Sequence, residues 1–483
     1  MQNLIVVDKI EHFQFTSEDL KVVTSQEYLG DECYSKSRYF RVYNLCQSYR
    51  YQKMGYYVSL LAEARGHRVF PSVQTLQDLK SRSIIRTLSD EIDELIQKNL
   101  SRIKSKEFIL SIYFGKNLAK QYERLSSQLY AMFQSPLLRV KFIFNRKKWI
   151  ITSVNTIALQ EVPDIHVEYL EGFAKDYFHR RVVARKQKKS SYDLAILHKP
   201  MDPLPPSNKK AIKKFIEAGE KLGFRVECIS KDDYIKLPNY DALFIRETTS
   251  VNHHTYRFAR HAVAEGLVVI DDPDSIIRCA NKVYLAEILA RGRVPRPKTV
   301  ILNGKMKTFN IDLPFPIILK LPDSSFSQGV VKVDNEADLL KTVNLYANTS
   351  DLLIAQEFLK TDFDWRIGVL NNQPLFACKY YMAKKHWQIY EWKKNNKFNA
   401  GYTETFALCD VPTEVLSTAL KATKLIGNGF YGVDIKVVDK PYVIEINDNP
   451  NIDHGIEDFV VGDKLYQDIM MYFLNAVKAS KTL

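Results

Sequence analysis

Strands and helices alternate along the segment that begins at Tyr192, and this alternation constrains the fold more than any other feature. The pattern predicts a buried strand at 193–197 and further strands at 225–229, 241–245 and 267–270. Between them lie two helical stretches, one that Asn208 can cap and one from His254 to Ala264. Strands separated by helices pair in parallel, so we expect a doubly wound layer. No GxGxxG motif follows the first strand, which argues against a dinucleotide site in this layer alone.

The residues up to about position 180 form a different region by pattern. Within its most distinctive stretch, residues 42–66, helical spacing runs from Tyr56 to Ala64 and ends at Arg65-Gly66, where glycine favours termination of a helix. The tyrosines and arginine at 49–51 could hold a ligand, but packing as an amphipathic cover is the simpler interpretation.

A basic run closes this first region. Six of the ten residues from Arg180 to Lys189 are Lys or Arg. Such runs are solvated more often than they form a site, so we expect a linker over residues 181–191.

Composition narrows the class of protein. A chain of 483 residues is too long for one hydrophobic core, so two or three domains are expected. Six cysteines without a CxxC pair argue against a disulfide framework or zinc cluster and suit a reducing cytosol, so we expect a cytoplasmic protein. No apolar run approaches the ~20 residues of a membrane span. The net charge of +13 would suit nucleic acid or acidic substrates, but no nucleic-acid-binding motif accompanies it.

Near the C-terminus, residues 431–451 contain two apolar strands around a turn at 439–440. If those two residues form the centre of the turn, Asp434 lies directly across from Glu445 on the neighbouring strand. Asn447 is two residues further along and projects from the same face as Glu445. Oxygen ligands without sulfur or imidazole suit Mg²⁺, which also binds substrate phosphates. We therefore expect a magnesium site, with solvated strand residues and an ordinary turn as the alternative.

These motifs resemble a known family. GVDI at 432–435 and EINDNPNIDHGIE at 445–457 resemble the metal-binding end of the RimK-like ATP-grasp ligases of the glutamate ligase type. The stretch NLC-SYRYQ-GYY-SLLAEARGH within 44–67 resembles the N-terminal domain attached to a subset of these proteins. The resemblance implies an α/β and α+β architecture. Its parts are a RimK-like ATP-grasp N-terminal domain at 1–180, a basic linker at 181–191, a doubly wound pre-ATP-grasp α/β domain at 192–290 and an ATP-grasp domain at 291–483.

The family pattern places two lysines upstream of the hairpin. Lys282 opens a helix, where a positive charge is unfavourable unless a bound phosphate offsets it; solvent exposure is the alternative. Lys320 ends a strand and precedes a Ser/Gly loop at 324–329, whose backbone N–H groups could close over phosphates. The nucleotide-binding residues expected in this loop are Ser327, Gln328 and Gly329.

Other site residues follow from the resemblance. Three residues match the family's interdomain hinge, where backbone groups hold the adenine and a carboxylate can hold the ribose: Gln356, Glu357 and Phe358. A strand running to its edge is the alternative. The segment DWR at 364–366 resembles the family's D-x-R strand, so Arg366 would neutralise the transferring phosphoryl group. Lys379 stands where these ligases often have arginine, and Asn399 lies in an Asn-containing segment that matches the family only loosely.

The resemblance implies an enzyme that phosphorylates a carboxylate with ATP and couples the acyl phosphate to an amine. The expected cofactors are ATP and Mg²⁺, with Mn²⁺ as an alternative metal. Glutamate or another amino acid would be added to a peptide or protein; the oligomeric state stays open. A small-molecule ligase of the glutathione synthetase type uses the same machinery and remains an alternative. From a different class, a non-catalytic nucleotide-binding scaffold that engages nucleic acid is the other alternative.

The acceptor itself could be anionic. Residues 379–397 carry six lysines interleaved with five aromatic residues, between the D-x-R strand and the metal hairpin. Lysines there could attract an acidic peptide. A solvated hairpin whose lysines protect an edge strand from pairing is the alternative.

Overall fold

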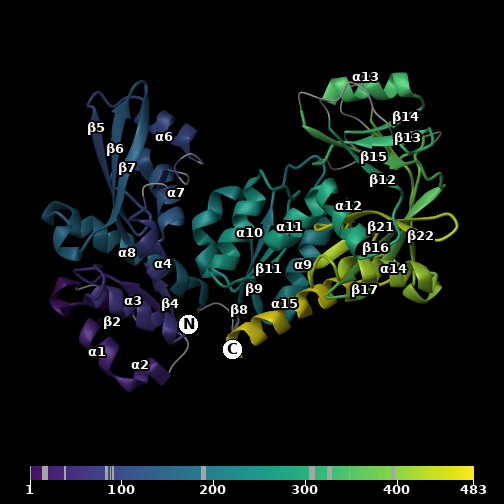
Figure 1. The fold of residues 1–483 in the computed structure, drawn as a ribbon. Coiled ribbons are helices and arrows are strands. Elements are labelled where there is room, and N and C mark those ends of the chain that lie inside the picture. Colours follow the sequence, from purple (N-terminus) through teal and green to yellow (C-terminus); the bar gives the residue numbers. More distant parts are fainter. Residues whose placement is uncertain are drawn as a thin grey trace. The chain divides into compact units, whose positions relative to one another are not determined.

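The computed structural model describes the whole chain except residues 1, 14–19, 37–39, 82–84, 87–88, 90–91, 186–191, 304–310, 324–328, 347–348, 385, 393–397 and 483. The chain forms two compact units, Met1–Lys189 and Ser190–Leu483 (Figure 1). Across the described ranges, no helix has both the length and the apolar composition needed to cross a membrane.

The first unit contains a four-stranded parallel sheet in the order β2-β1-β3-β4. Its strands are β1 (Gln2–Val7), β2 (Leu20–Thr24), β3 (Phe40–Asn44) and β4 (Arg68–Phe70). Alternate residues of β1 pack on opposite faces: Val6 lies in a cluster with Val58 of α3 (Met54–Ala64), whereas Ile5 lies in a cluster with Phe178 of α8 (Asp164–Arg185). Helices α1 (Ser25–Gly30), α2 (Glu32–Lys36) and α4 (Val73–Asp78) complete this layer.

A second, antiparallel sheet lies in the same unit. Its strands, in the order β5-β6-β7, are β5 (Glu107–Tyr113), β6 (Leu137–Asn145) and β7 (Lys148–Thr156). Helices α6 (Asp93–Leu100) and α7 (Glu123–Phe133) accompany them. Helix α8 continues to Arg185, so the first part of the predicted linker is helical, and residues 186–191 lie outside the described residues.

The second unit begins with a parallel sheet in the order β11-β10-β8-β9. Its strands are β8 (Tyr192–His198), β9 (Phe224–Ile229), β10 (Ala242–Arg246) and β11 (Val268–Ile270). Ile196 packs with Phe215 of α9 (Lys209–Lys221) on one face, while Leu197 packs with Phe258 of α10 (His254–Ala264) on the other. Helices on both faces of a parallel sheet confirm the predicted doubly wound layer.

The two parallel sheets share one strand order. Numbered along the chain within each sheet, both read 2-1-3-4. The matching helix–strand connections, α3 to β4 and α10 to β11, each pass through a glycine in the left-handed region, Gly66 at φ 71° and Gly266 at φ 70°. Glycine adopts this conformation without a steric penalty. The first unit thus contains a layer of the same topology as the second.

The predicted cap at Asn208 is confirmed, because its side-chain oxygen accepts a hydrogen bond from the N–H of Ala211 at 2.9 Å. We expect Asn208→Ala to lower the free energy of unfolding of the second unit by about 1 kcal/mol. The shift of its urea midpoint measures this loss. Asn208→Asp keeps the capping oxygen and should remain near wild type; an equal loss in both variants would contradict a capping role.

Two antiparallel lobes follow the doubly wound layer (Figure 1). The smaller lobe has the strand order β12-β15-β13-β14, formed by β12 (Thr299–Asn303), β13 (Ile317–Lys320), β14 (Val330–Val333) and β15 (Leu352–Glu357), with α13 (Glu336–Tyr346) packed on it. The larger lobe has the order β20-β17-β16-β21-β22, formed by β16 (Phe363–Leu370), β17 (Gln373–Tyr381), β20 (Thr403–Phe406), β21 (Phe430–Val437) and β22 (Pro441–Asn447). Its core includes residues of α12 (Lys282–Arg291) and α14 (Thr413–Thr423). A short ribbon joins β18 (Tyr390–Trp392) to β19 (Phe398–Ala400).

The C-terminal helix ties the larger lobe to the doubly wound layer. On α15 (Lys464–Thr482), Tyr466 packs edge-on against Phe215 of α9, with ring centroids 4.8 Å apart. The same buried cluster contains Phe376 and Phe430 of the larger lobe. Residues on either side of position 290 therefore share one core, and the division at 290/291 stays a prediction.

Candidate functional site

The hairpin of β21 and β22 brings Asp434 opposite Glu445, the pairing that the sequence predicts. The predicted two-residue turn is wrong, because Val437 pairs with Pro441 and three residues, 438–440, lie between the strands. That pairing alone would shift the register by one residue. An irregularity between Asp434 and Ile435 leaves Ile444 as an extra residue on β22 and restores the pairing. A longer turn and a bulge thus compensate each other.

Arg366 on β16 binds Asp434 on the adjacent strand with two contacts. Its Nη2 donates to Asp434 Oδ2 at 2.7 Å, and its Nε contacts Oδ1. Its guanidinium also lies 5.0 Å from the centre of the Tyr380 ring. Burial lowers the pKa of Arg366, but the paired Asp434 carboxylate outweighs burial and raises it above its ordinary value. Arg366 is therefore a permanently charged group beside the hairpin.

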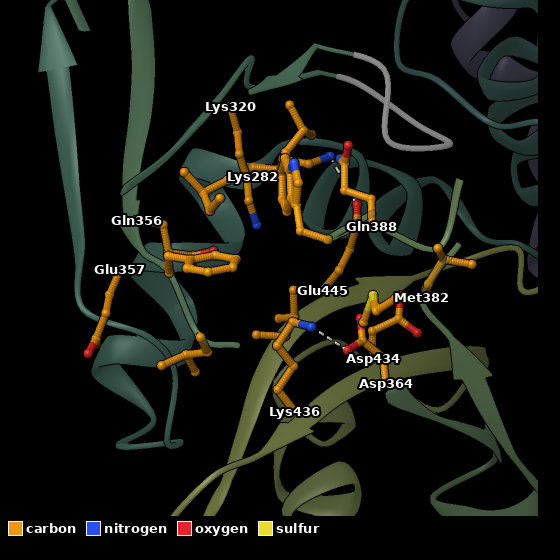
Figure 2. Close-up of a pocket in the computed structure, with 17 residues that line it drawn as sticks. Lys282, Lys320, Gln356, Glu357, Asp364, Met382, Gln388, Asp434, Lys436 and Glu445 are labelled. Carbon is orange, nitrogen blue, oxygen red and sulfur yellow. Dashed lines mark hydrogen bonds and ion pairs between the residues drawn. The ribbon is translucent and has the colours of Figure 1, made fainter. Parts of the chain in front are cut away.

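Two lysines face Glu445 from other elements. Lys282, the first residue of α12, places its Nζ 2.9 Å from Glu445 Oε1. Lys320, the last residue of β13, is buried, and burial lowers its pKa to about 8 although the Glu445 charge opposes the shift. Figure 2 shows both lysine side chains extending into the cavity that Glu445 also lines. Lys282 is buried, which rules out the alternative of solvent exposure, and two lysines approach one partly exposed carboxylate.

Asn447 lies close to the two carboxylates. Its Nδ2 is 3.4 Å from Asp434 Oδ2, and with Asp434, Glu445 and Arg366 it lines a second cavity of about 250 Å³. Across the described ranges, no three His, Cys, Asp or Glu side chains gather closely enough to hold a metal by themselves. The oxygens of Asp434, Glu445 and Asn447 form a hard donor set that fits Mg²⁺, provided that phosphate oxygens or waters complete its coordination.

Arg246 anchors the loop that follows Asn447. Its buried guanidinium donates to Pro450 O at 2.9 Å and contacts Asn449 Oδ1, while it also donates to Ser207 Oγ. Burial lowers its pKa to about 10. Because Arg246 ends β10 of the doubly wound layer, this layer fixes where the loop begins and so orients Asn447.

The three hinge residues lie at the end of β15 and line the first cavity. Gln356 Nε2 donates to Thr299 Oγ1 at 3.1 Å. The Glu357 carboxylate accepts from the backbone N–H of Lys298 at 3.2 Å. The Phe358 ring lies 6.0 Å from the Trp387 ring in an edge-on contact.

The Ser/Gly loop is described only at its end. Gly329 has φ +67°, and a Cβ there would lie 2.8 Å from the Leu321 side chain. Both the backbone conformation and the close side-chain contact therefore favour glycine at this position. Ser327 and Gln328 lie outside the described residues, and their nucleotide-binding role stays a prediction.

Sequence reasoning missed one ion pair in the first cavity. Lys436 Nζ lies 2.5 Å from Asp364 Oδ1 and donates to Thr361 Oγ1 at 2.7 Å (Figure 2). Strand alternation could have found both residues, since Asp364 shares a face with Arg366, and Lys436 shares one with Asp434. Further missed lining residues are Met382, Trp387 and Gln388.

The second cavity also contains residues that sequence reasoning missed. Thr248, Thr249 and Ser250 follow β10, at the carboxyl edge of the parallel sheet where ligands usually bind. Asp448 is buried there, and burial raises its pKa to about 7. Asp434 and Glu445 line both cavities, so the two cavities meet at the hairpin carboxylates.

Two predicted catalytic residues lie elsewhere. Lys379 pairs with Trp365 and therefore projects from the face opposite Arg366, where its ammonium lies 4.5 Å from the Phe363 ring centre and 4.6 Å from that of Phe406. Asn399 lies on β19 across from Glu391 and is not among the described residues that line either cavity. Lys379 points away from Arg366 because successive residues of a strand project from opposite faces of the sheet. Asn399 belongs to the separate β18–β19 ribbon. Neither residue is therefore assigned a catalytic role.

The lysine-rich segment 379–397 is described only in part. Lys385, Lys393, Lys394 and Lys397 lie outside the described residues, whereas Lys384 is exposed. Trp387 and Gln388 from this segment line the first cavity, so part of it borders the proposed nucleotide side. The anionic-acceptor hypothesis stays a prediction.

Known proteins resemble both regions of the chain. Residues 25–172 match the RimK-like ATPgrasp N-terminal domain, and residues 279–464 match the RimK-like ATP-grasp domain. The alpha-aminoadipate–LysW ligase LysX of Saccharolobus solfataricus is 30% identical over 255 residues, which cover 49% of this chain and 88% of that protein. The tetrahydromethanopterin:alpha-L-glutamate ligase of Methanocaldococcus jannaschii is 27% identical over 273 residues, covering 53% and 87%. The solved D-alanine–D-alanine ligase from Bacillus anthracis gives a TM-score of 0.46 at 15% identity, covering 60% of this chain and 99% of that one.

Both regions thus match their respective domain families, and the similarity to LysX extends over most of that protein. The chain belongs to the RimK-like ATP-grasp family, whose members are ATP-dependent carboxylate–amine ligases.

Proposed function

We propose that this chain uses ATP to join the amine of glutamate, or of another amino acid, to a carboxylate of a peptide or protein. One observation carries the proposal: two cavities meet at Asp434 and Glu445, with Lys282, Lys320 and Arg366 beside them. A nucleotide in one cavity and a carboxylate substrate in the other would approach each other at these charges.

The first cavity fits the nucleotide. Its apolar wall at Ile318, Phe358 and Leu359 suits an adenine ring, and the backbone at Gln356 to Phe358 offers hydrogen-bonding groups to the ring edge. Lys282 and Lys320 lie toward the hairpin, where they would hold the phosphates. The Glu357 carboxylate would hold the ribose after releasing the Lys298 N–H.

Asp434, Glu445 and Asn447 would hold the metal. Proteins of the ATP-grasp family bind ATP and divalent metals in general, and oxygen-only donors favour Mg²⁺ over softer metals. When bound, the ion neutralises charge on the phosphates during transfer. Lys282 and Arg366, which contact these carboxylates, would also be available to phosphate oxygens held there.

The reaction proceeds in two displacements. A carboxylate oxygen of the acceptor attacks the γ-phosphorus of ATP, the bond to the bridging oxygen breaks, and ADP leaves. Arg366 stabilises the charge on the phosphoryl oxygens during this step. The uncharged amine then attacks the acyl carbon, inorganic phosphate leaves, and the amine's surplus proton passes to solvent. Each turnover gives one amide, one ADP and one phosphate.

The choice of glutamate and of a peptide or protein acceptor rests on the relatives. One relative carries glutamate ligation in its name, and another acts on LysW. Ile389 and Tyr390 line the second cavity together with the hydroxyl residues Thr248 to Ser250. This mixture of apolar and hydroxyl groups suits an amino acid with its backbone and side chain both engaged.

Screening amino acids against peptide pools for ADP release, followed by weighing the products, tests the proposal. We expect ADP release only when Mg²⁺, an amine and a carboxylate acceptor are all present, with a product mass equal to the two substrates minus one water. ATP binding without amine-dependent ADP release would instead support a nucleotide-binding scaffold. A product in which two free amino acids are joined would identify a small-molecule ligase.

A further inference from the structure

A groove of about 960 Å³ runs along the outer side of helix α12. Its described lining residues are Val251, Ile277, Asn281, Val283, Tyr284, Glu287, Ile288, Arg291, Gly292, Ile301, Asp323 and Leu425. They come from the doubly wound layer, from both lobes and from α12 itself. Neither the nucleotide site nor the metal site uses this groove.

Helix α12 presents opposite faces to the nucleotide side and to the groove. Lys282, Leu285 and Leu289 face the interior, where Lys282 reaches Glu445. Tyr284, Ile288 and Arg291 follow at helical spacing on the other face and line the groove. The helix therefore forms a wall between the nucleotide phosphates and the groove.

The groove and the second cavity share a lining residue. Asp323 lines both spaces, and Asn281 at the start of α12 holds it, with Nδ2 donating to Asp323 Oδ1 at 3.1 Å. Ser250 borders the second cavity and its neighbour Val251 borders the groove. A chain lying in the groove would therefore reach the hairpin carboxylates at its Asp323 end.

The second cavity and the groove differ in the size of the molecule that each can hold. The second cavity holds about 250 Å³, whereas the groove holds about 960 Å³. The ten residues of α12 span roughly 15 Å at 1.5 Å per residue, the length of four or five residues of extended chain at about 3.3 Å each. A free amino acid fits within the second cavity, whereas only a longer molecule can extend into the groove as well.

The chemistry of the groove is apolar along its length and polar at its rim. Tyr284, Ile301 and Val251 are 41%, 44% and 43% exposed, although all three are large apolar side chains. Glu287 and Arg291 provide the rim on α12. Adjacent exposed apolar side chains with a polar rim are typical of a binding surface.

We propose that the groove binds the acceptor peptide, in extended form, through apolar side chains in the few residues that precede its reactive carboxylate. This inference rests on the proposed ligase function and adds the substrate class: a peptide with an apolar segment next to the modified end. The carboxylate passes Asp323 into the second cavity, and the preceding residues lie against Tyr284, Ile288 and Ile301. The apolar contacts provide affinity, and the metal and cations act on the carboxylate alone.

Two pools of five-residue peptides that end in glutamate test the groove. One pool carries Leu, Ile, Val or Phe before the glutamate, and the other carries Ser, Thr, Asn or Gln. The full chain is assayed for ADP release with free glutamate as amine, alongside the double variant Tyr284→Ser/Ile301→Ser. The control variant, Leu340→Ser/Leu345→Ser on α13, removes two exposed leucines of the smaller lobe (40% and 71% exposed).

For the wild type and the control, we expect kcat/KM to be about tenfold higher or more for the apolar pool, from burial of two or three side chains. In the Tyr284→Ser/Ile301→Ser variant the two pools should become nearly equal, mainly through a higher KM, while ATP KM stays unchanged. Equal rates for both pools in the wild type would overturn the proposal. The proposal would also be overturned if Tyr284→Ser/Ile301→Ser unfolded at a lower temperature but kept the preference for the apolar pool. The groove residues would then pack against other parts of the chain instead of binding a peptide.

A binding measurement separates this inference from the ligase function. The apolar pool with glutamine in place of the terminal glutamate and an amidated end, labelled with fluorescein, is titrated with each variant by anisotropy. If the peptide binds the wild type and the control but not Tyr284→Ser/Ile301→Ser, the groove proposal is supported. That support holds even if no ADP is released, because the absence of ADP release would contradict only the ligase proposal. Equal binding to all three proteins would overturn the groove proposal. So would sedimentation that shows a dimer of the wild type that Tyr284→Ser/Ile301→Ser does not form, because a second copy of the chain would then occupy the groove.

Discussion

The Glu445→Gln variant is expected to lose turnover by about a thousandfold or more while keeping its fold, since both a proposed metal ligand and the ion-pair partner of Lys282 are removed. Glutamine has the same shape, so packing is preserved. It cannot balance the two lysine charges that it meets: Lys282 Nζ is 2.9 Å away, and the Lys320 charge also acts on this carboxylate. ADP release at saturating Mg²⁺ and ATP measures the loss, and circular dichroism checks the fold.

Glu404→Gln is the matched control, because Glu404 is an exposed carboxylate on β20 of the same sheet. It should retain wild-type turnover. If Glu445→Gln retained Mg²⁺-dependent turnover as well, the hairpin carboxylates would be structural and the metal would have to bind elsewhere.

Lys320→Met should weaken ATP binding about ten- to hundredfold, the range of a lost charge-assisted contact. Methionine keeps most of the apolar stem of this buried residue, so little packing is lost. Lys282→Met should also weaken ATP binding, but it leaves Glu445 without its ion-pair partner as well. Titration calorimetry with ATP and Mg²⁺ measures both. Lys341→Met, an exposed lysine on α13 of the same lobe, should bind ATP normally; wild-type affinity in Lys320→Met would place the phosphates elsewhere.

The lowered pKa of Lys320 adds a pH dependence to that prediction. Burial sets the pKa at about 8, so the side chain is an ammonium below this pH and a neutral amine above it. Phosphates favour the ammonium, so the ATP dissociation constant should be flat below the pKa and rise as the pH increases above it. In Lys320→Met the rise should disappear, while Lys341→Met should keep it. A rise of equal size in Lys320→Met would assign the titration to another group.

Local sequence patterns determined the doubly wound layer and the hairpin. The predicted strands at 193–197 and 241–245 are apolar after their first residue because both faces of a parallel sheet are covered, and such runs are readable without tertiary information. The Asn208 cap is likewise a contact between residues three positions apart. For Asp434 and Glu445 the sequence predicted the correct pair through a turn that is one residue too short. Hairpin register depends on turn length and bulges together, and the local sequence pattern indicates only the turn.

Contacts between distant segments could not be predicted in this way. Lys379 was expected in the site, but its strand parity relative to Arg366 depends on which residues of β16 and β17 pair, and this pairing turns it toward Phe363 and Phe406. Asp364 and Lys436 meet across two strands that are 72 positions apart in sequence. Arg246 fixes the loop after Asn447 from a residue 204 positions before Pro450.

The sequence by itself determined the family and the order of the elements, and it supplied the residue types of the proposed nucleotide and metal site, because these follow from spacing within single strands and helices. The tertiary structure alone decided which charges are paired, that Lys320 is buried deeply enough to lower its pKa, and that a groove runs along the outer face of α12. The reason is physical: ion pairing, desolvation and concave surfaces depend on distances between atoms of separate elements, and packing sets those distances.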